Sequence, residues 1–277
     1  MHFERRHILI TGASGGIGAA LAQALATEHA SLLLHGRNQT ALSTLADQCR
    51  QLGASSVITC CADLTSPVGR EHLIHCVDSA FSQLDTLINN AGISCFQLFD
   101  QQTPEQIEQL ISTNISAPLL LTRALIQPLL KQADEPPVIL NIGSAFGAIG
   151  FPGYSTYCAS KGALRLFSEA LAREYADTRL RVQYLAPRAT RTAINSEQAN
   201  AMTAATGSSS DSPERVAKVA LKLLRSGRAQ AAVGWPEKLL VRLNGLRPEL
   251  ISQVLSKQLD KIKHFANQTE TETETGA

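Results

Sequence analysis

Short runs of apolar residues alternate along the chain with longer segments in which apolar residues recur at helical spacing. The short runs are apolar nearly end to end, which is typical of parallel β-strands covered on both faces. They predict seven strands, at His7–Ile10, Ser31–His35, Val57–Ala62, Leu84–Asn89, Val138–Ile142, Arg181–Ala186 and Ala231–Gly234.

The longer segments predict helices at Gly16–His29, Thr40–Gln51, Val68–Phe81, Pro104–Lys131, Tyr154–Asp177 and Pro213–Ser226. Thr103, Pro104 and Glu105 are typical of an N-cap and first helical turn, and Gly53 of a helix stop. Strands that alternate with helices imply a parallel sheet with right-handed crossovers. We therefore predict one α/β domain over residues 1–234, with a doubly wound parallel sheet of about seven strands and helices on both faces.

After residue 234 the pattern predicts a helical extension over residues 235–268 and a disordered, low-complexity tail over 269–277. The extension holds six Lys/Arg and three Asp/Glu, and it carries an apolar stripe of Leu250, Ile251, Val254, Leu255, Leu259, Ile262 and Phe265. Such a stripe can form a lid or lie on a membrane surface, or it can pack on the domain or on a second subunit. We favour packing, and expect residues 235–265 to cap one side of a substrate pocket, with Trp235 shielded from water.

Composition excludes several classes of protein. With 25 basic and 24 acidic residues among 277, nothing global indicates a nucleic-acid partner. The N-terminus has no signal-peptide pattern and no apolar run approaches transmembrane length, so we expect a cytoplasmic protein. None of the six cysteines forms a C-x-x-C pair, and we saw no Cys/His spacing typical of a metal site. We therefore expect free thiols and no metal.

A glycine-rich turn, Thr11-Gly12-Ala13-Ser14-Gly15-Gly16-Ile17-Gly18, joins the first strand to the first helix. Glycine there permits a tight turn with positive φ, and it lets a pyrophosphate reach the helix N–H groups. This position after an apolar strand predicts a dinucleotide site lined by Gly12, Ser14, Gly16, Ile17 and Gly18.

The end of the second strand bears on which dinucleotide binds. Sites that favour NAD place an acidic residue there, whereas this chain reads Leu34-His35-Gly36-Arg37-Asn38. Arg37 offers donors for a 2′-phosphate, which favours NADP(H) over NAD(H), although a solvated loop arginine is the alternative. Asp63, after the third strand, either accepts from the adenine amino group or caps a helix.

Tyr157 and Lys161 stand at i and i+4, which places a phenol and an ammonium on one face of a helix. A nearby ammonium favours the phenolate, so we expect Lys161 to lower the pKa of Tyr157 toward the range of a general acid or base. Ser144 follows the fifth predicted strand, and ligands of open α/β sheets bind at strand ends.

Together these residues resemble the short-chain dehydrogenase/reductase family over roughly residues 5–234. Its T-G-x-x-x-G-x-G pattern is met by Thr11, Gly12, Gly16 and Gly18, its N-N-A-G motif by Asn89-Asn90-Ala91-Gly92, and its Tyr-x-x-x-Lys pair by Tyr157 and Lys161. The glycine spacing differs from that of the extended branch, which includes sugar-nucleotide epimerases. The resemblance implies a Rossmann-type fold and hydride transfer between NADP(H) and a carbonyl/alcohol substrate.

The resemblance also implies roles for single residues. Tyr157 passes the proton, Ser144 positions the substrate oxygen, Lys161 holds the nicotinamide ribose, and Asn114 supports a water that connects Lys161 to solvent. The remaining residues implied to line the cofactor are Asn90, Pro187 and Thr192. A homodimer or homotetramer is expected, acting as a ketone reductase on an apolar or acyl-type substrate.

The chain departs from the family after the sixth strand, where Arg188 follows Pro187 in place of glycine. Arg188 therefore either contacts substrate or points to solvent. Specificity is expected in Thr190–Asp211, of which Met202–Ser210 reads as a mobile, lightly packed lid. Two other functions stay open on these residues: an NADP(H)-binding regulator without turnover, and a membrane-surface scaffold that uses the C-terminal helices.

Overall fold

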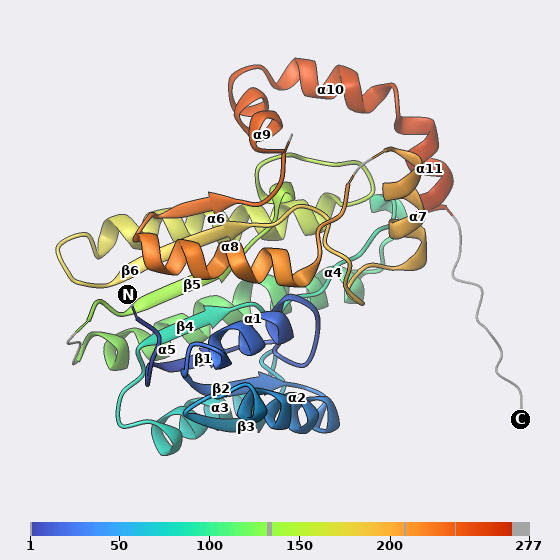
Figure 1. Cartoon of the computed structure of the whole chain (residues 1–277). Coiled ribbons are helices and arrows are strands. Elements are labelled where there is room, and N and C mark those ends of the chain that lie inside the picture. The colour runs from blue at the N-terminus through green and yellow to red at the C-terminus, as the bar shows by residue number, and fades with distance from the viewer. Residues whose placement is uncertain (1, 132–134, 208, 236, 268–277) are drawn as a thin grey trace, which may run out of the picture.

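The computed structural model describes residues 2–131, 135–207, 209–235 and 237–267. Seven parallel strands form one sheet in the order β3-β2-β1-β4-β5-β6-β7 (Figure 1). Their bounds are β1 His7–Ile10, β2 Ser31–Gly36, β3 Ser56–Cys61, β4 Thr86–Asn89, β5 Val138–Ile142, β6 Arg181–Ala186 and β7 Gln230–Ala232. The seven predicted strands and the doubly wound sheet are confirmed, with ends that shift by one or two residues.

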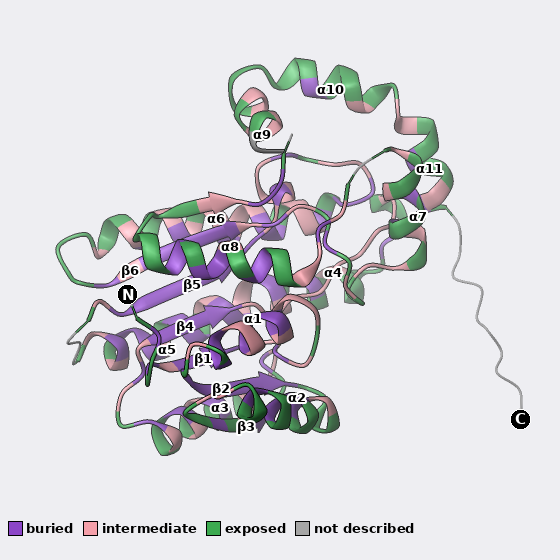
Figure 2. Ribbon diagram, viewed as in Figure 1, coloured by how far each residue is buried: buried purple, intermediate pink, exposed green. Residues whose placement is uncertain are grey.

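Helices cover both faces of the sheet, and Figure 2 shows the buried residues concentrated between the layers. One apolar core lies under α1 (Gly16–Ala26), α2 (Gln39–Gln51) and α8 (Pro213–Ser226). The other lies under α3 (Pro67–Ala80), α5 (Ala117–Leu130) and α6 (Ser155–Glu174). Alternate residues of one strand serve the two cores, since Ile8 and Ile10 enter the first and Leu9 the second.

The order of the strands changes direction at β1, because β2 lies beside it on one side and β4 on the other. In open α/β sheets this reversal opens a crevice at the carboxyl ends of the strands, where ligands bind. The glycine-rich turn after β1 and the Asn90-Ala91-Gly92 segment after β4 both lie at this crevice.

The prediction of one regular helix over Pro104–Lys131 is wrong. The segment is divided into α4 (Pro104–Ile111), a π-helical turn at Ser112–Ser116, and α5. Thr103 is the N-cap of α4, as predicted, and it also forms a capping box with Gln106. The predicted mobile lid is also partly wrong, because residues from Glu197 form a helix, α7 (Glu197–Ala205), in which Ala199 and Met202 are buried.

The C-terminal extension forms α9 (Glu237–Leu246), α10 (Pro248–Ser256) and α11 (Leu259–Ala266). Figure 1 shows α9 and α10 standing away from the sheet and α11 returning to α7. Ile262 of α11 is fully buried, so docking is confirmed for this helix. The prediction is wrong for the start of the extension, because Trp235 is 68% exposed.

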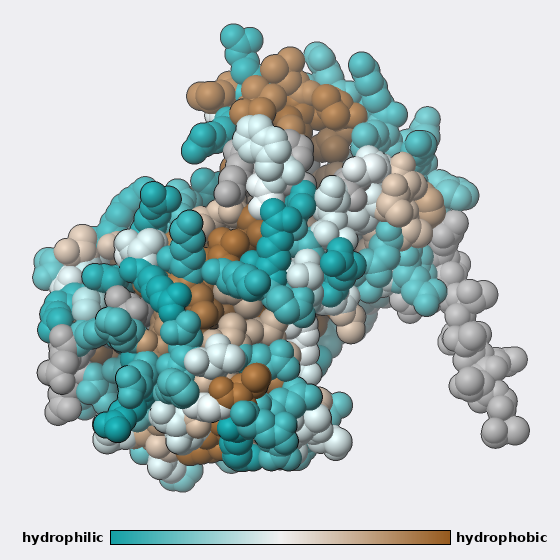
Figure 3. Space-filling view, viewed as in Figure 1, coloured by the Kyte–Doolittle hydropathy of each residue, from teal (hydrophilic) through white to brown (hydrophobic). Residues whose placement is uncertain are grey.

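Leu246, Leu250 and Val254 are exposed as well, and Figure 3 shows apolar side chains gathered over this part of the surface. Across the described ranges, no helix combines the length and the apolar character needed to cross a membrane. The predicted disordered tail, 269–277, lies outside the described residues.

Candidate active site

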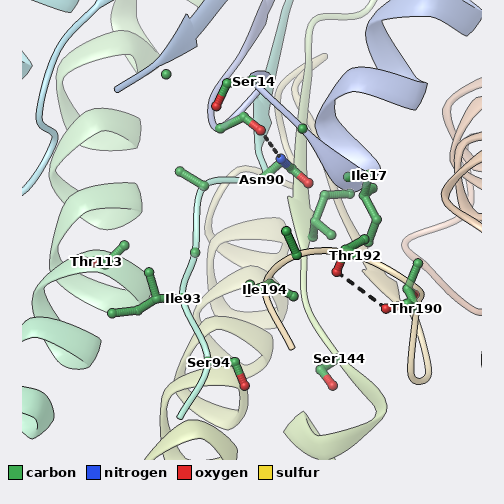
Figure 4. Close-up of a pocket in the computed structure, with 18 of the residues that line it drawn as sticks. Ser14, Ile17, Asn90, Ile93, Ser94, Thr113, Ser144, Thr190, Thr192 and Ile194 are labelled. Carbon is green, nitrogen blue, oxygen red and sulfur yellow. Dashed lines mark hydrogen bonds between the residues drawn. The ribbon is translucent and has the colours of Figure 1, made fainter. Parts of the chain in front are cut away.

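A cleft of about 900 Å³ opens at the crevice between the two halves of the sheet. The glycine-rich turn lines one end and Ser144 with the start of α6 lines the other, as Ser14 and Ser144 show in Figure 4. The predicted site residues that reach the cleft are Gly12, Ser14, Gly16, Ile17, Arg37, Asp63, Asn90, Ser144, Tyr157, Lys161, Pro187 and Thr192.

Hydrogen bonds hold the glycine-rich turn against residues 90–93, which follow β4 and form the strand-β4 turn. Gly12 has φ +63, and a Cβ there would lie 2.7 Å from the Cα atom of Ala91. The Asn90 amide donates to the carbonyls of Thr11 and Gly12, at 3.0 and 2.9 Å. The Thr11 hydroxyl accepts the N–H groups of Asn90 and Ala91, both at 3.0 Å. Asn90 therefore holds the backbone of the glycine-rich turn in place through the carbonyls of Thr11 and Gly12.

The N-terminus of α1 is free to bind an anion. Its N-cap, Gly15, supplies no side-chain hydrogen bond, and a Cβ at Gly15 would meet nothing within 4 Å. Unsatisfied N–H groups at a helix N-terminus attract phosphate. These features fit a dinucleotide pyrophosphate. Gly18 is the exception to the prediction: it does not line the cleft, because it packs where a Cβ would lie 2.3 Å from the Gly12 carbonyl oxygen.

Two donors lie at the end of β2. The Ser14 hydroxyl oxygen lies 3.0 Å from the position a Cβ of Gly36 would take, and exposed Arg37 follows directly. Asp63 lines the same end and accepts from the N–H and hydroxyl of Thr65 at 2.9 and 2.8 Å, which lowers the pKa of its carboxyl. Ser66, not Asp63, caps α3, so the helix-cap alternative for Asp63 is wrong.

His35 was not predicted as a site residue, although it lines the cleft and is 2% exposed. One ring nitrogen lies 3.0 Å from the Ala62 carbonyl oxygen and the other accepts the Gly12 N–H at 3.5 Å. Burial lowers the pKa of His35 to about 4, so the ring is neutral at pH 7. A neutral ring that donates to Ala62 and accepts from Gly12 ties β2 and β3 to the glycine-rich turn. The sequence signal that could have identified His35 as a site residue is its position at the end of the second strand, directly before Gly36.

Ser144 lies one residue beyond Gly143, which follows β5. The Ser144 hydroxyl accepts the Phe146 N–H at 3.1 Å, and the backbone N–H of Ser144 donates to the Tyr184 hydroxyl at 3.2 Å. A Cβ at Gly143 would lie 2.0 Å from the Tyr184 ring. The turn is therefore built around Tyr184, which fixes the direction of the Ser144 side chain.

Tyr157 and Lys161 lie on the first turns of α6 and face Ser144. The Lys161 ammonium lies 5.7 Å from the centre of the Tyr157 ring and donates to the Ile142 carbonyl at 3.3 Å. Burial lowers the pKa of Lys161 to about 8. Burial also raises the pKa of the Tyr157 phenol, an effect that a hydrogen bond with Ser144 only partly opposes.

The expectation that Lys161 lowers the pKa of Tyr157 is therefore wrong for the protein alone. Both groups share surroundings that disfavour charge, and desolvation is the main cause of the shift of each pKa. At neutral pH the Tyr157 phenol carries its proton and is a proton donor.

Asn114 lies behind the cleft, in the π-helical turn, and is 1% exposed. Its side chain accepts the Ile93 N–H and donates to the Ile93 carbonyl, both at 2.9 Å, and it donates to the Ser160 hydroxyl at 3.1 Å. The interruption of the helix turns Asn114 toward this segment; π-helical turns are frequent at functional sites. Asn114 thus joins the strand-β4 turn to α6, next to Lys161.

Arg188 lines the cleft, so its expected contact with substrate stays a prediction, and its side chain is 9% exposed rather than turned to solvent. Its guanidinium pairs with the buried Asp211 carboxylate through two bonds of 3.0 Å and donates to the Trp235 carbonyl at 3.2 Å. Backbone bonds from Arg191 to Asp211 and from Asp211 to Ala189 close the same loop. The pair fixes the segment that carries Thr192 into the cleft, as Figure 4 shows for Thr192 and Thr190.

An aromatic cluster adjoins Tyr157. Phe146 and Tyr154 lie 6.5 and 5.8 Å from its ring, and Phe151 stacks on Phe146 at 4.9 Å. Met202 of α7 and Ile262 of α11 belong to the same apolar cluster. Through α11 the extension therefore packs on the cluster beside Tyr157, but none of its described residues lines the cleft, so the predicted cap over the substrate pocket is wrong for this cleft.

Comparisons with known proteins agree with this geometry. The family model described as short chain dehydrogenase matches residues 6–203. The 3-oxoacyl-(acyl-carrier-protein) reductase of Escherichia coli is 32% identical over 187 residues, which cover 68% of this chain and 74% of that protein. Nodulation protein G of a Rhizobium species is 36% identical over 182 residues, covering 66% and 72%.

Solved structures are similar as well. A short-chain dehydrogenase from Sphingobium yanoikuyae in complex with NADPH is 29% identical with a TM-score of 0.75, covering 89% of this chain and 95% of that one. A 3-ketoacyl-(acyl-carrier-protein) reductase from Brucella melitensis complexed with NADH is 25% identical with a TM-score of 0.76, covering 85% and 99%.

Proposed function

The chain belongs to the short-chain dehydrogenase/reductase family, and from that premise we propose that it reduces a 3-oxoacyl-type ketone with NADPH, using Ser144, Tyr157 and Lys161. Family membership makes the chain an oxidoreductase that uses a nicotinamide cofactor and acts on a carbonyl/alcohol pair. The two non-catalytic alternatives, a regulator and a membrane-surface scaffold, are not favoured.

One observation carries the proposal for the site. Three side chains from two elements, Ser144 after β5 and Tyr157 and Lys161 on α6, meet at one end of the cleft whose other end fits a pyrophosphate. A regulator that only binds the dinucleotide has no use for a proton donor held there.

When bound, the nicotinamide supplies or accepts the hydride. The Tyr157 phenol gives its proton to the substrate oxygen, and the Ser144 hydroxyl holds that oxygen by a hydrogen bond. We assign to Lys161 the ribose hydroxyls of the cofactor, and to Asn114 the support of a water that reaches Lys161 from solvent. Burial disfavours the Tyr157 phenolate, so at pH 7 the phenol carries the proton that reduction of a ketone requires.

The preference for NADPH rests on the end of β2. Ser14 and Arg37 offer donors to a 2′-phosphate there. Asp63 lies at the same end with its carboxylate satisfied by Thr65, and we assign to it the adenine amino group. Similar solved structures carry either NADPH or NADH, so the preference rests on this chain's own residues.

The substrate class is supported by the relatives. Two similar proteins are 3-oxoacyl or 3-ketoacyl reductases by name. The aromatic residues Phe146, Phe151 and Tyr154 pack beside Tyr157 without lining the cleft, so the acyl class rests on the relatives. We further propose a cytoplasmic homodimer or homotetramer, which exposed apolar side chains such as Leu120 and Leu166 support.

Steady-state oxidation of NADPH and NADH tests the proposal. We expect turnover with short- and long-chain 3-oxoacyl thioesters, faster than with unsubstituted ketones, and with NADPH favoured at least tenfold in kcat/KM. A panel that gives no cofactor oxidation with any carbonyl would refute the reductase, whereas turnover only with simple ketones would refute the acyl substrate class alone.

A further inference from the structure

Two cysteines and a histidine meet on the edge of the sheet that is opposite the C-terminal helices. Cys60 lies in β3, and His72 and Cys76 stand at i and i+4 on α3, which covers that strand. Their ligand atoms all lie within 4.8 Å of one another, and the Cys76 sulfur lies 3.8 Å from Nε2 of His72. Within the described part of the chain this is the one group of three such residues. No Cys/His spacing along the sequence indicates this group, which only the fold brings together.

The sequence pattern concealed this group because its members come from two elements. His72 and Cys76 share a helix face, since residues four apart are neighbours there. Cys60 is added only when α3 packs on the sheet, where Cys60 joins the same apolar core as Leu73 and Val77. Its partners were therefore fixed by the fold rather than by local spacing.

We propose that Cys60, His72 and Cys76 form a zinc site, with water as the fourth ligand. Tetrahedral zinc has Zn–S and Zn–N bonds of about 2.3 and 2.0–2.1 Å, so its ligand atoms lie roughly 3.5–3.8 Å apart. The observed distance of 3.8 Å from the Cys76 sulfur to Nε2 of His72 exceeds the expected S–N edge of about 3.5–3.6 Å by only a few tenths of an ångström, which a small rotation of the exposed His72 ring would close. Two thiolates and one imidazole are also the donor types that zinc prefers.

Burial of the three residues differs in a way that suits such a site. Cys60 is 2% exposed and fixed by the core, Cys76 is half-buried, and His72 is exposed. The rigid cysteine therefore anchors the ion, the exposed side leaves room for a water, and two thiolates neutralise the 2+ charge beside the apolar core. The ion would tie α3 to β3, which is the edge strand of the sheet. The ion would take no part in chemistry at the cleft, since Cys60, His72 and Cys76 do not line it.

Co²⁺ titration of the reduced, chelator-treated, tag-free full chain tests the site without reference to catalysis. We expect a thiolate-to-cobalt charge-transfer band and tetrahedral d–d bands that saturate at one equivalent and are displaced by Zn²⁺. Zn²⁺ should also raise the unfolding temperature, and a chelator should reverse the rise. His72→Ala and Cys76→Ser should each weaken binding at least about tenfold, because loss even of groups that only support a ligand has that effect.

Matched controls come from the neighbouring residues. Cys61→Ser and His75→Ala change a thiol and an imidazole adjacent to the proposed ligands, both exposed and outside the group, and should leave binding unchanged. The absence of a charge-transfer band in the reduced wild type would overturn the proposal. So would a band that survives both His72→Ala and Cys76→Ser. A Cys60–Cys76 disulfide in the protein as isolated, with no metal uptake after reduction, would also overturn it.

Discussion

The buried pair of Arg188 and Asp211 allows a direct test of how the segment that carries Thr192 into the cleft is held. Side chains of the two are 9% and 1% exposed, and two bonds of 3.0 Å join them. Removing one partner of a buried pair typically destabilises a protein by about 3–5 kcal/mol, because the other charge is left uncompensated. After Asp211→Ala, Arg188 keeps the Trp235 carbonyl. We therefore expect the lower end, a loss of about 3 kcal/mol in the free energy of unfolding.

Urea unfolding of a double-mutant cycle measures the pair itself. Arg188→Ala and Asp211→Ala together should destabilise by about 2 kcal/mol less than the sum of the two single changes. Arg215→Ala is the control, because Arg215 contacts the same carboxylate at 3.1 Å but is 60% exposed. It should lower stability by less than about 1 kcal/mol. Single effects that add to within about 0.5 kcal/mol would refute the coupling of Arg188 to Asp211.

Three further predictions concern the site. Arg37→Ala should weaken NADPH binding about tenfold, near 1.5 kcal/mol because Arg37 is exposed, while fluorescence titration shows NADH unchanged; equal losses for both cofactors would contradict a phosphate contact. The pKa of His35 is about 4 in the folded protein, against 6.5 for a histidine in an unfolded chain. As the pH falls, the unfolded chain therefore takes up the proton before the folded protein does. Stability should therefore fall by about 3 kcal/mol as the pH drops from 6.5 to 4. His35→Gln should flatten that part of the pH profile of urea unfolding, and an unchanged slope would count against it. Tyr157→Phe should lower turnover by about 10²–10⁴-fold with NADPH affinity retained, and near-normal turnover would mean that another group handles the proton.

Local signals predicted much of the fold. The bounds of β1, β5, β6 and α8 agree with the sequence pattern, because continuous apolar strands and a Ser212-Pro213 helix start leave little freedom. The glycine-rich turn, Asn90 and Ser144 were likewise readable, since each follows a strand and therefore meets the others at one edge of the sheet.

What the sequence concealed depends on contacts between distant segments. Asp211 lies 23 positions from Arg188, so no local pattern pairs them. The π-helical turn at 112–116 lies in a stretch with ordinary helical composition, and its geometry is tied to bonds from Asn114 to Ile93 and Ser160. The raised pKa of Tyr157 depends on how completely the fold buries the phenol, which the spacing to Lys161 does not contain.

Transfer of deuterium tests the central claim most directly. NADPH that carries deuterium on the transferable position of C4 is incubated with a 3-oxoacyl thioester, and the 3-hydroxyacyl product is examined by mass spectrometry and NMR. The account predicts one deuterium on the carbinol carbon with wild-type protein and loss of that product with Tyr157→Phe. A product without cofactor-derived deuterium, or equal labelled product from the variant, would contradict it.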